Sequence, residues 1–163
     1  MTPSARFATF LARYDPAVAA TARAALTRMR RYVPGAVELV YDNYNALVIG
    51  FGPTDRASDA IFSIALYPRW VTLFFLQGAR LRDPDALLKG AGTRVRHVVV
   101  TEPSVLDSPG VRRLIRDALA AAPQRPAGRR RMIVKSVSPR QRPRRPATRG
   151  PATARGGGRR PAR

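Results

Sequence analysis

The stretch LLKGAGTRVRHVVV, residues 87–100, contains glycines and arginines at a spacing that could bind an anion. A Walker-type phosphate loop requires a lysine directly after its last glycine, and here the lysine precedes both glycines. A dinucleotide-binding loop requires a strand before the glycines and a helix after them, and this stretch has the reverse order. We therefore expect Gly90 to end a helical turn and Gly92 to lie in the turn that follows. The alternative is an anion site formed by backbone N–H groups near Arg94 and Arg96.

His97 is the only histidine of the chain and could act as a general base or a metal ligand. Strand alternation places it between Val95 and Val99 on one face. No acidic residue lies near it in sequence to orient its imidazole ring. A packed histidine is therefore the favoured interpretation, and a histidine that faces a pocket is the alternative.

Carboxylates are the other candidates, either as general acids and bases or as ligands of hard cations. Glu38 and Asp42 lie on one face of an expected strand, but four residues separate them by about 13 Å, which is too far to chelate one ion. Asp83 and Asp85 flank a proline and are expected to cap a turn.

No pattern in the chain indicates catalysis. There is no cysteine for thiolate chemistry or for a sulfur-based zinc site. No serine lies in the nucleophile elbow of a hydrolase. We therefore expect a noncatalytic protein without a resident metal or cofactor.

The elements that position these residues follow from hydrophobic periodicity. Helical spacing of apolar residues predicts two helices before residue 35 and a third over residues 108–122. Between them, apolar runs bounded by turn residues predict about five strands. Runs of strands bracketed by helices indicate an α+β fold, with an antiparallel sheet and the C-terminal helix packed on it.

One expected strand, WVTLFFLQ, is apolar on both of its faces. Either both faces of the sheet are covered, or one of them presents an apolar surface to a ligand or to a second subunit, as in a homodimer. Few basic residues interleave the aromatic residues of the strands, so we expect those aromatic residues to form the core rather than to stack on bases.

The charge is unevenly distributed along the 163 residues. Of the formal net charge of +20, +14 belongs to residues 123–163, which contain no acidic residue. We expect an α+β domain over residues 1–122 and a short extended segment over 123–138 that could pair as an edge strand. Residues 139–163 are rich in Arg, Pro and Gly and are expected to form a disordered tail.

A basic segment of this kind attracts polyanions, with nonspecific nucleic-acid dissociation constants on the order of 10⁻⁴ to 10⁻⁶ M at physiological salt. The arginines that we expect to contact nucleic acid are Arg140, Arg142, Arg144, Arg145, Arg159 and Arg160. The alternative is a solubilising appendage whose composition reflects GC-rich coding.

The apolar runs are too short or too interrupted for a signal peptide or a membrane-spanning helix. Together with the absence of cysteine, this predicts a soluble, cytoplasmic protein that does not bind membranes.

Five stretches of the chain resemble the YdhG-like domain family, domain of unknown function 1801. They are ELVYDNYNALVIGF, LYPRWVTLFFLQGARLRDP, LLKGAGTRVRHVVV, VRRLIRDAL and IVKSVSPRQRPRRP. The resemblance runs from about residue 4 to about residue 146. Its most specific element is the Gly-x-Gly followed by Arg-His, carried by Gly90, Gly92, Arg96 and His97.

The resemblance implies an α+β domain and matches Glu38 and Tyr41 to a glutamate and a tyrosine of the first strand region. The chain departs from many members at residues 42–44, where Asp-Asn-Tyr replaces Gly-x-Pro. Part of the family carries a frataxin-like iron-chaperone label, which would make iron the cargo. The net basic charge of this domain disfavours iron.

Three functional hypotheses follow. The first is a noncatalytic module that binds a small ligand or a protein in a pocket where Glu38, Tyr41, Arg96 and His97 converge. The second is nonspecific association with nucleic acid through the tail. The third is the iron chaperone that the resemblance implies.

Overall fold

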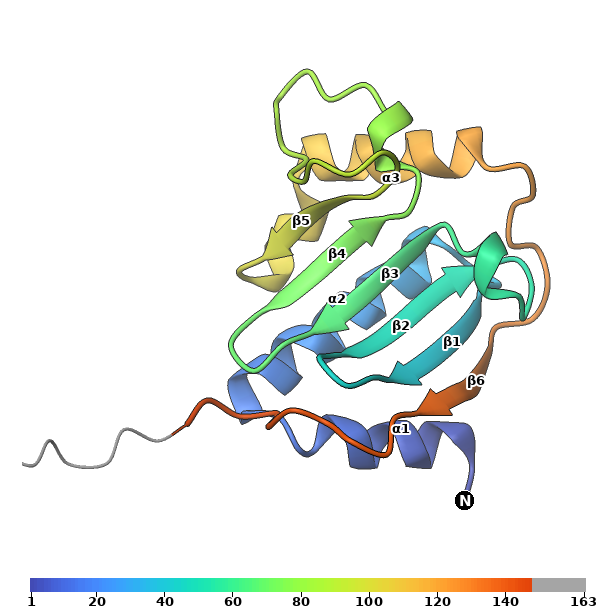
Figure 1. The fold of residues 1–163 in the computed structure, drawn as a ribbon. Helices are drawn as coiled ribbons and strands as arrows, with labels where there is room; N and C mark the ends of the chain where they lie inside the picture. The colour runs from blue at the N-terminus through green and yellow to red at the C-terminus, as the bar shows by residue number, and fades with distance from the viewer. Residues whose placement is uncertain (148–163) are drawn as a thin grey trace, which may run out of the picture.

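A six-stranded mixed sheet organises residues 1–147, the part of the chain that the computed structural model describes (Figure 1). The helices are α1 (Pro3–Leu11), α2 (Pro16–Tyr32) and α3 (Pro109–Ala121). The strands are β1 (Val37–Asp42), β2 (Leu47–Gly52), β3 (Phe62–Leu66), β4 (Val71–Phe75), β5 (Arg96–Val100) and β6 (Arg131–Val137). Three short 3₁₀ helices complete the fold: η1 (Ala57–Asp59), η2 (Gly78–Arg80) and η3 (Pro103–Asp107).

The sheet confirms the α+β class and corrects the expected topology. The strand order is β5-β4-β3-β2-β1-β6, and every neighbouring pair is antiparallel except β1 and β6, which are parallel. The expectation of a purely antiparallel sheet of about five strands is wrong, because a sixth strand pairs with β1 in parallel. The chain returns after α3 along residues 122–130, so β6 enters beside β1 in the same direction. The extended segment expected over 123–138 contains this edge strand.

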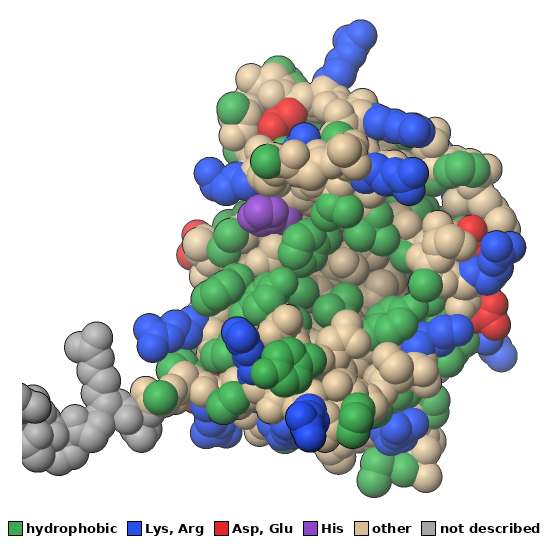
Figure 2. Space-filling model, in the orientation of Figure 1, with side chains coloured by type: hydrophobic (Ala, Val, Ile, Leu, Met, Phe, Trp, Pro, Cys, Tyr) green, Lys and Arg blue, Asp and Glu red, His purple; other side chains and the backbone are tan. Residues whose placement is uncertain are grey.

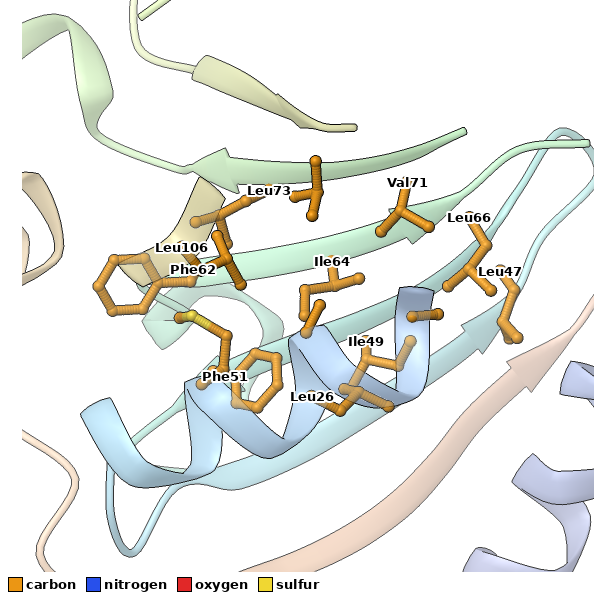
Figure 3. Packing of buried hydrophobic residues seen from close by; sticks show 14 of the residues in the cluster. Leu26, Leu47, Ile49, Phe51, Phe62, Ile64, Leu66, Val71, Leu73 and Leu106 are labelled. Carbon is orange, nitrogen blue, oxygen red and sulfur yellow. The ribbon is translucent and has the colours of Figure 1, made fainter. Parts of the chain in front are cut away.

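One face of the sheet, which we call the covered face, packs against α2. Pro16 occupies the first turn of α2, where its missing N–H leaves no hydrogen bond unmade. The buried residues of α2 recur at helical spacing: Val18, Ala19, Ala22, Ala25, Leu26 and Met29. They form one hydrophobic core with the residues on one side of the sheet, as Figure 3 shows for Leu26, Ile49 and Ile64. Residues of α3 and η3 extend the same core, among them Leu106 and Leu114.

The opposite face, which we call the open face, is not crossed by any α-helix of the described residues (Figure 1). It carries the alternate residues of the same strands. In register across the sheet these are Leu39, Gly50, Ser63, Phe74 and His97 in one row and Tyr41, Val48, Ala65, Thr72 and Val99 in the next. One of the two arrangements expected from the sequence WVTLFFLQ is therefore present, namely an apolar sheet surface without a helical cover.

Residues 138–147 lie against the domain, beside α1 and the β1–β2 turn. Arg144 is 4% exposed and its Nη2 donates to Asp42 Oδ1 at 2.7 Å. The expected disorder from residue 139 onward is therefore wrong for residues 139–147, because a buried carboxylate holds an arginine of this segment in place. The rest of that expectation, including Arg159 and Arg160, lies outside the described residues.

Within residues 1–147, none of the helices combines the length and the apolar character needed to cross a lipid bilayer.

Candidate functional site

The four residues expected to share a pocket do not converge. Glu38 and Arg96 lie on the covered face, at the two ends of a row that crosses five strands. Tyr41 and His97 lie on the open face, also on β1 and β5. Four inter-strand steps separate β1 from β5, so each pair is about 19 Å apart. Alternation within a strand was predictable, but the number of strands between β1 and β5 was not.

Glu38 is a structural ion-pair residue. Its side chain is fully buried and accepts two hydrogen bonds from Arg30, at 3.0 and 2.8 Å. Arg130 donates a third at 3.2 Å. A buried carboxylate requires such partners, and here they join α2, β1 and the residues before β6. Glu38 therefore does not face a ligand site.

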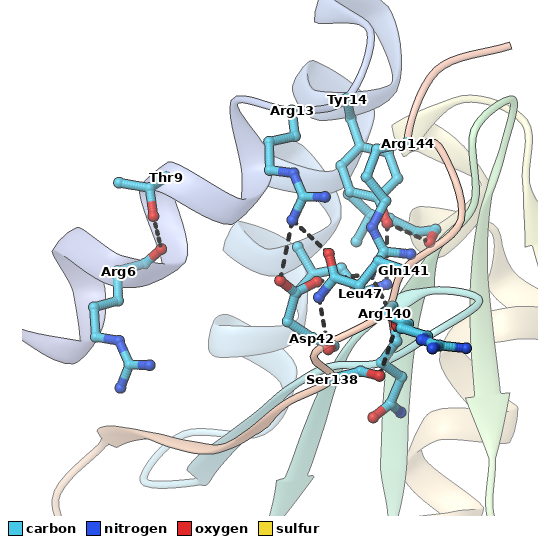
Figure 4. Close-up of polar contacts among 12 residues, drawn as sticks. Arg6, Thr9, Arg13, Tyr14, Asp42, Leu47, Ser138, Arg140, Gln141 and Arg144 are labelled. Carbon is cyan, nitrogen blue, oxygen red and sulfur yellow. Dashed lines mark hydrogen bonds and ion pairs between the residues drawn. The ribbon is translucent and has the colours of Figure 1, made fainter. Parts of the chain in front are cut away.

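Asp42, at the other end of β1, is held in the same way (Figure 4). It is 1% exposed and pairs with Arg144 at 2.7 Å and with Arg13 at 3.4 Å. The Arg144 guanidinium also lies over the Tyr14 ring, 5.7 Å from its centroid. Burial raises the pKa of Tyr14, whose hydroxyl donates to the Leu66 carbonyl. The sequence indicated that Glu38 and Asp42 share one face of β1. In the structure each carboxylate forms ion pairs with two different arginines.

Among the described residues, no group of three or more His, Cys, Asp or Glu side chains is arranged to hold a metal ion.

The loop before β5 differs from the expected helix end. Residues 86–88 are not helical, and Lys89 instead forms an isolated antiparallel bridge with His97. The two residues exchange backbone hydrogen bonds of 2.9 Å each. Gly90 follows with a φ of +119°, which only glycine adopts without strain. The glycine therefore allows the chain to leave a strand-like bridge, and it does not terminate a helical turn.

The same loop does not form the anion site considered near Arg94. The Arg96 guanidinium donates to the carbonyl oxygens of Gly92 and Val95. The loop thus turns carbonyls, not N–H groups, toward this arginine. The Arg94 side chain is exposed.

The turn before this loop is capped as expected by one of the two predicted aspartates. Asp83 accepts hydrogen bonds from the backbone N–H groups of Leu87 and Leu88, at 2.9 and 2.8 Å. Asp85 instead pairs with Arg113 of α3 at 2.7 Å.

His97 packs on the open face, against the ring of Phe74. The two ring centroids are 5.6 Å apart and the ring planes are inclined by 50°. Both side chains are partly exposed. Across the sheet, Tyr41 has a buried hydroxyl without a hydrogen-bond partner among the described residues, and burial raises the pKa of that tyrosine. His97 is therefore both a packed residue and part of a surface.

The open face combines an apolar middle with a basic margin. Figure 2 shows hydrophobic side chains gathered over the middle strands, the histidine at one side of them, and Lys and Arg side chains around the periphery. The side chains at the centre are small, such as Ala65 and Thr72, and larger ones flank them, such as Tyr41 and Phe74. Residues 1–147 contain 25 Lys and Arg against 10 Asp and Glu, a formal net charge of +15.

Two pockets lie outside the expected site. One, of about 330 Å³, is bounded by the end of α3, η1 and η2, and it is lined in part by Phe75 and Leu81. The other, of about 690 Å³, lies between the β3–β4 hairpin and residues 142–147.

The most exposed aromatic residue of this second pocket, Trp70, was expected to be core. The adjacent Arg69 in a proline turn was the sequence signal that could have identified it.

Comparisons of the chain with protein-family models, with curated proteins and with solved structures produced no match. The resemblance to the YdhG-like family therefore stays a prediction from the quoted stretches.

Proposed function

We propose that the protein is a noncatalytic binding module that holds single-stranded nucleic acid on the open face of its sheet. The observation that carries the proposal is an apolar sheet surface with partly exposed aromatic side chains in a chain of net charge +20. Unstacked bases present planar apolar faces, and the phosphates that join them are anionic. A single strand therefore matches both the middle and the margin of this face.

Charge distinguishes this partner from a second copy of the chain. A face-to-face homodimer would bring two basic margins together, and like charges repel in such an arrangement. A polyanion instead neutralises the margin and releases condensed counterions. Duplex nucleic acid keeps its bases stacked inside, so it would use the charges but leave the apolar middle of the face empty.

The tail supports this function from the sequence side. Residues 123–163 supply +14 of the net charge, and the described part of this segment places Arg142 and Arg145 beside the domain. In this proposal the tail contributes nonspecific attraction and the open face contributes the preference for unpaired bases.

The carboxylates favour binding over chemistry and over iron carriage. Glu38 and Asp42 are each held by two arginines, so neither is free to act as a base or to coordinate iron. The proposal therefore assigns no catalytic residue.

The test compares two valine-to-glutamate variants by fluorescence anisotropy with a labelled oligothymidylate of about 12 nucleotides. Val99 lies on the open face, and Val137 is a 43% exposed residue of the edge strand β6. Both substitutions add one negative charge. We expect Val99→Glu to lower the affinity roughly tenfold and Val137→Glu to lower it less than twofold.

Thermal unfolding of both variants provides the folding control. If Val99→Glu does not fold, Val95→Glu replaces it, because Val95 is 40% exposed beside His97. Equal losses of oligonucleotide affinity for the open-face and edge variants would exclude the open face as the binding surface. No binding of the oligonucleotide at low salt would refute the proposed function altogether, and so would tighter binding of a duplex of equal length.

A further inference from the structure

The turn between β3 and β4 presents a rigid aromatic pair at one end of the open face. Tyr67 and Trp70 stack with their ring centroids 5.0 Å apart and their planes inclined by 25°. The hydrogen bond from Tyr67 N–H to the Trp70 carbonyl, 2.9 Å, closes the turn through Pro68 and Arg69. Trp70 is nevertheless 46% exposed. The turn thus holds an indole ring with one side packed on the tyrosine and a large part of its surface open.

The pocket beside this pair is cationic. Its volume is about 690 Å³, and its lining includes Arg69 from the turn and Arg142 and Arg145 from the C-terminal segment. None of the described residues that line it is acidic. Three guanidinium groups around an exposed indole favour a ligand that is both planar and anionic.

The two arginines of the C-terminal segment are positioned by contacts outside the pocket. The Arg142 guanidinium lies over the Tyr44 ring, 5.6 Å from its centroid, and its backbone N–H donates to the Tyr44 carbonyl at 2.9 Å. Arg145 donates to the Arg13 carbonyl at 3.3 Å. Side chains that are already ordered lose less conformational entropy when a ligand binds.

Arg144, the residue between them, anchors the whole segment. It points away from the pocket into the domain, where it pairs with the buried Asp42 and lies over the Tyr14 ring (Figure 4). The buried ion pair thereby fixes the register of residues 142–147 relative to the hairpin. This gives the Asp42–Arg144 pair a positioning role in addition to its contribution to stability.

The pocket is continuous with the open face. Trp70 directly precedes β4, two residues before Thr72 and four before Phe74. Strand alternation, extended by one residue, therefore puts Trp70 on the same side of the sheet as these two open-face residues. Trp70 and Phe74 are about 13 Å apart along the strand. A single strand that crosses the open face therefore reaches the hairpin pocket without changing sides.

We infer that the pocket formed by Tyr67, Trp70, Arg69, Arg142 and Arg145 binds one nucleotide of a single-stranded nucleic acid. The base stacks on the exposed part of the Trp70 indole, and the adjoining phosphate is bound by the guanidinium groups. The inference rests on the proposed function and specifies where its principal stacking contact lies. It distinguishes nucleic acid from other anions because it requires the base as well as the phosphate.

Intrinsic fluorescence provides a direct test, because Trp70 is the only tryptophan of the chain. Titration of the full-length protein with an unlabelled oligothymidylate of about 12 nucleotides is expected to quench this emission, since a stacked base lies against the indole. An abasic oligonucleotide with the same number of phosphates is expected to quench weakly and to bind roughly tenfold less tightly.

Variants then separate the base contact from the charge contact in the anisotropy assay. Trp70→Ala is expected to lower the affinity roughly tenfold, and Trp70→Phe, which keeps an aromatic ring, to retain most of it. Arg69→Gln is expected to lower the affinity about three- to tenfold. Arg116→Gln, an equal charge change on an exposed position of α3, is expected to lower it less than twofold.

Each outcome decides the inference. Quenching that is lost with the abasic strand, with selective effects of the Trp70 and Arg69 variants, supports it. Equal effects of Arg69→Gln and Arg116→Gln, or equal binding of the abasic strand, would overturn it. If Val99→Glu weakens binding while Trp70→Ala does not and the emission stays constant, the nucleotide pocket is wrong and the proposed function stands. If no oligonucleotide binds, both are wrong.

Discussion

The two faces of the sheet carry alternate residues of the same strands, and they differ in the kinds of side chain that they carry. The covered face carries large apolar residues such as Phe62 and Ile64, together with the paired carboxylates Glu38 and Asp42. The open face carries small and aromatic residues such as Ala65 and Phe74. A sheet with one solvated face ordinarily alternates apolar residues inward with polar residues outward. Here the charged residues of β1 point inward, and most outward positions of the sheet are apolar or aromatic, with Ser63, Thr72 and His97 as the polar ones.

This inversion supports the proposal that the open face is a contact surface. Soluble monomers rarely expose contiguous apolar patches of more than a few hundred Å² without a functional reason. The buried carboxylates on the other side are explained by their arginines, which tie α2 and the C-terminal segment to β1. The covered face therefore accounts for the stability of the fold, and the proposed binding is assigned to the open face.

The strongest expected difference between the faces is in the cost of removing a phenylalanine. Phe62 is fully buried and packs edge to face with Phe75, its partner on β4, at 5.6 Å. Phe74, the neighbour of Phe75 in the chain, lies on the open face and is partly exposed. Phe62→Ala is expected to lower the free energy of unfolding by about 3–5 kcal/mol, because it leaves a cavity. Phe74→Ala is expected to cost roughly 1–2 kcal/mol, because solvent fills the space. Urea denaturation measures both.

Phe74→Ala should also weaken binding of the oligothymidylate while Phe62→Ala, if it folds, should not. Equal losses of stability would contradict the assignment of Phe74 to an uncovered surface.

A second matched pair adds volume instead of removing it. Ala25 on α2 is fully buried against the sheet, and Ala65 is 1% exposed at the centre of the open face. Ala25→Leu is expected to destabilise by about 1–3 kcal/mol, because the added methyl groups have no space between helix and sheet. Ala65→Leu is expected to destabilise less than Ala25→Leu, because Ala65 is buried by its neighbours on the sheet and not by an α-helix packed over it.

Thermal unfolding compares the two leucine variants. A large loss of thermal stability for Ala65→Leu would mean that the space above the open face is occupied. Its oligonucleotide binding gives a separate readout, since a leucine at this position also obstructs the middle of the surface.

The fold class could be predicted from the sequence because it depends on local periodicity. The spacing of apolar residues in α2 and the alternation around His97 are properties of short windows, and both agree with the structure. The pairing of β6 with β1 depends on a connection of nine residues after α3, whose course no short window records. The burial of Arg144 likewise depends on Asp42, 102 residues earlier in the chain.

The proposed binding surface could be predicted only in part, for the same reason. The sequence WVTLFFLQ indicated that one face could be uncovered, but it did not indicate which face α2 would cover. The prediction that Glu38, Tyr41, Arg96 and His97 form one pocket was wrong. Sequence motifs that resemble those of a family identify residues, but they do not give the order of the strands that separate these residues. Trp70 was assigned to the core because the turn that exposes it contains a single arginine, Arg69. The other two arginines of the pocket, Arg142 and Arg145, belong to a segment that was expected to be disordered.

The smallest expected effect concerns a polar contact that attaches α2 to the end of the covered face. Asp107 of η3 accepts hydrogen bonds from the Tyr32 hydroxyl at 2.5 Å and from Arg28 Nε at 2.8 Å. These hydrogen bonds, the one from Tyr32 first, hold the pKa of the Asp107 carboxyl below its usual range. The folded state therefore binds this proton less tightly than the unfolded chain does. The contact contributes stability above the unfolded pKa of about 3.9, and this contribution is lost as the pH falls through the folded value.

Because the Asp107 side chain is 38% exposed, solvent screening limits its contribution to less than about 1 kcal/mol. We expect the melting temperature of the wild type to exceed that of Asp107→Asn near neutral pH, and the difference to shrink below about pH 4. Asp117→Asn on α3, for which the described residues offer no ion pair, is the control and should show no such convergence. A constant difference down to low pH would mean that the shape of the side chain matters and its charge does not. Binding of the oligothymidylate at neutral pH should be the same for Asp107→Asn and the wild type, because the contact lies on the covered side of the sheet.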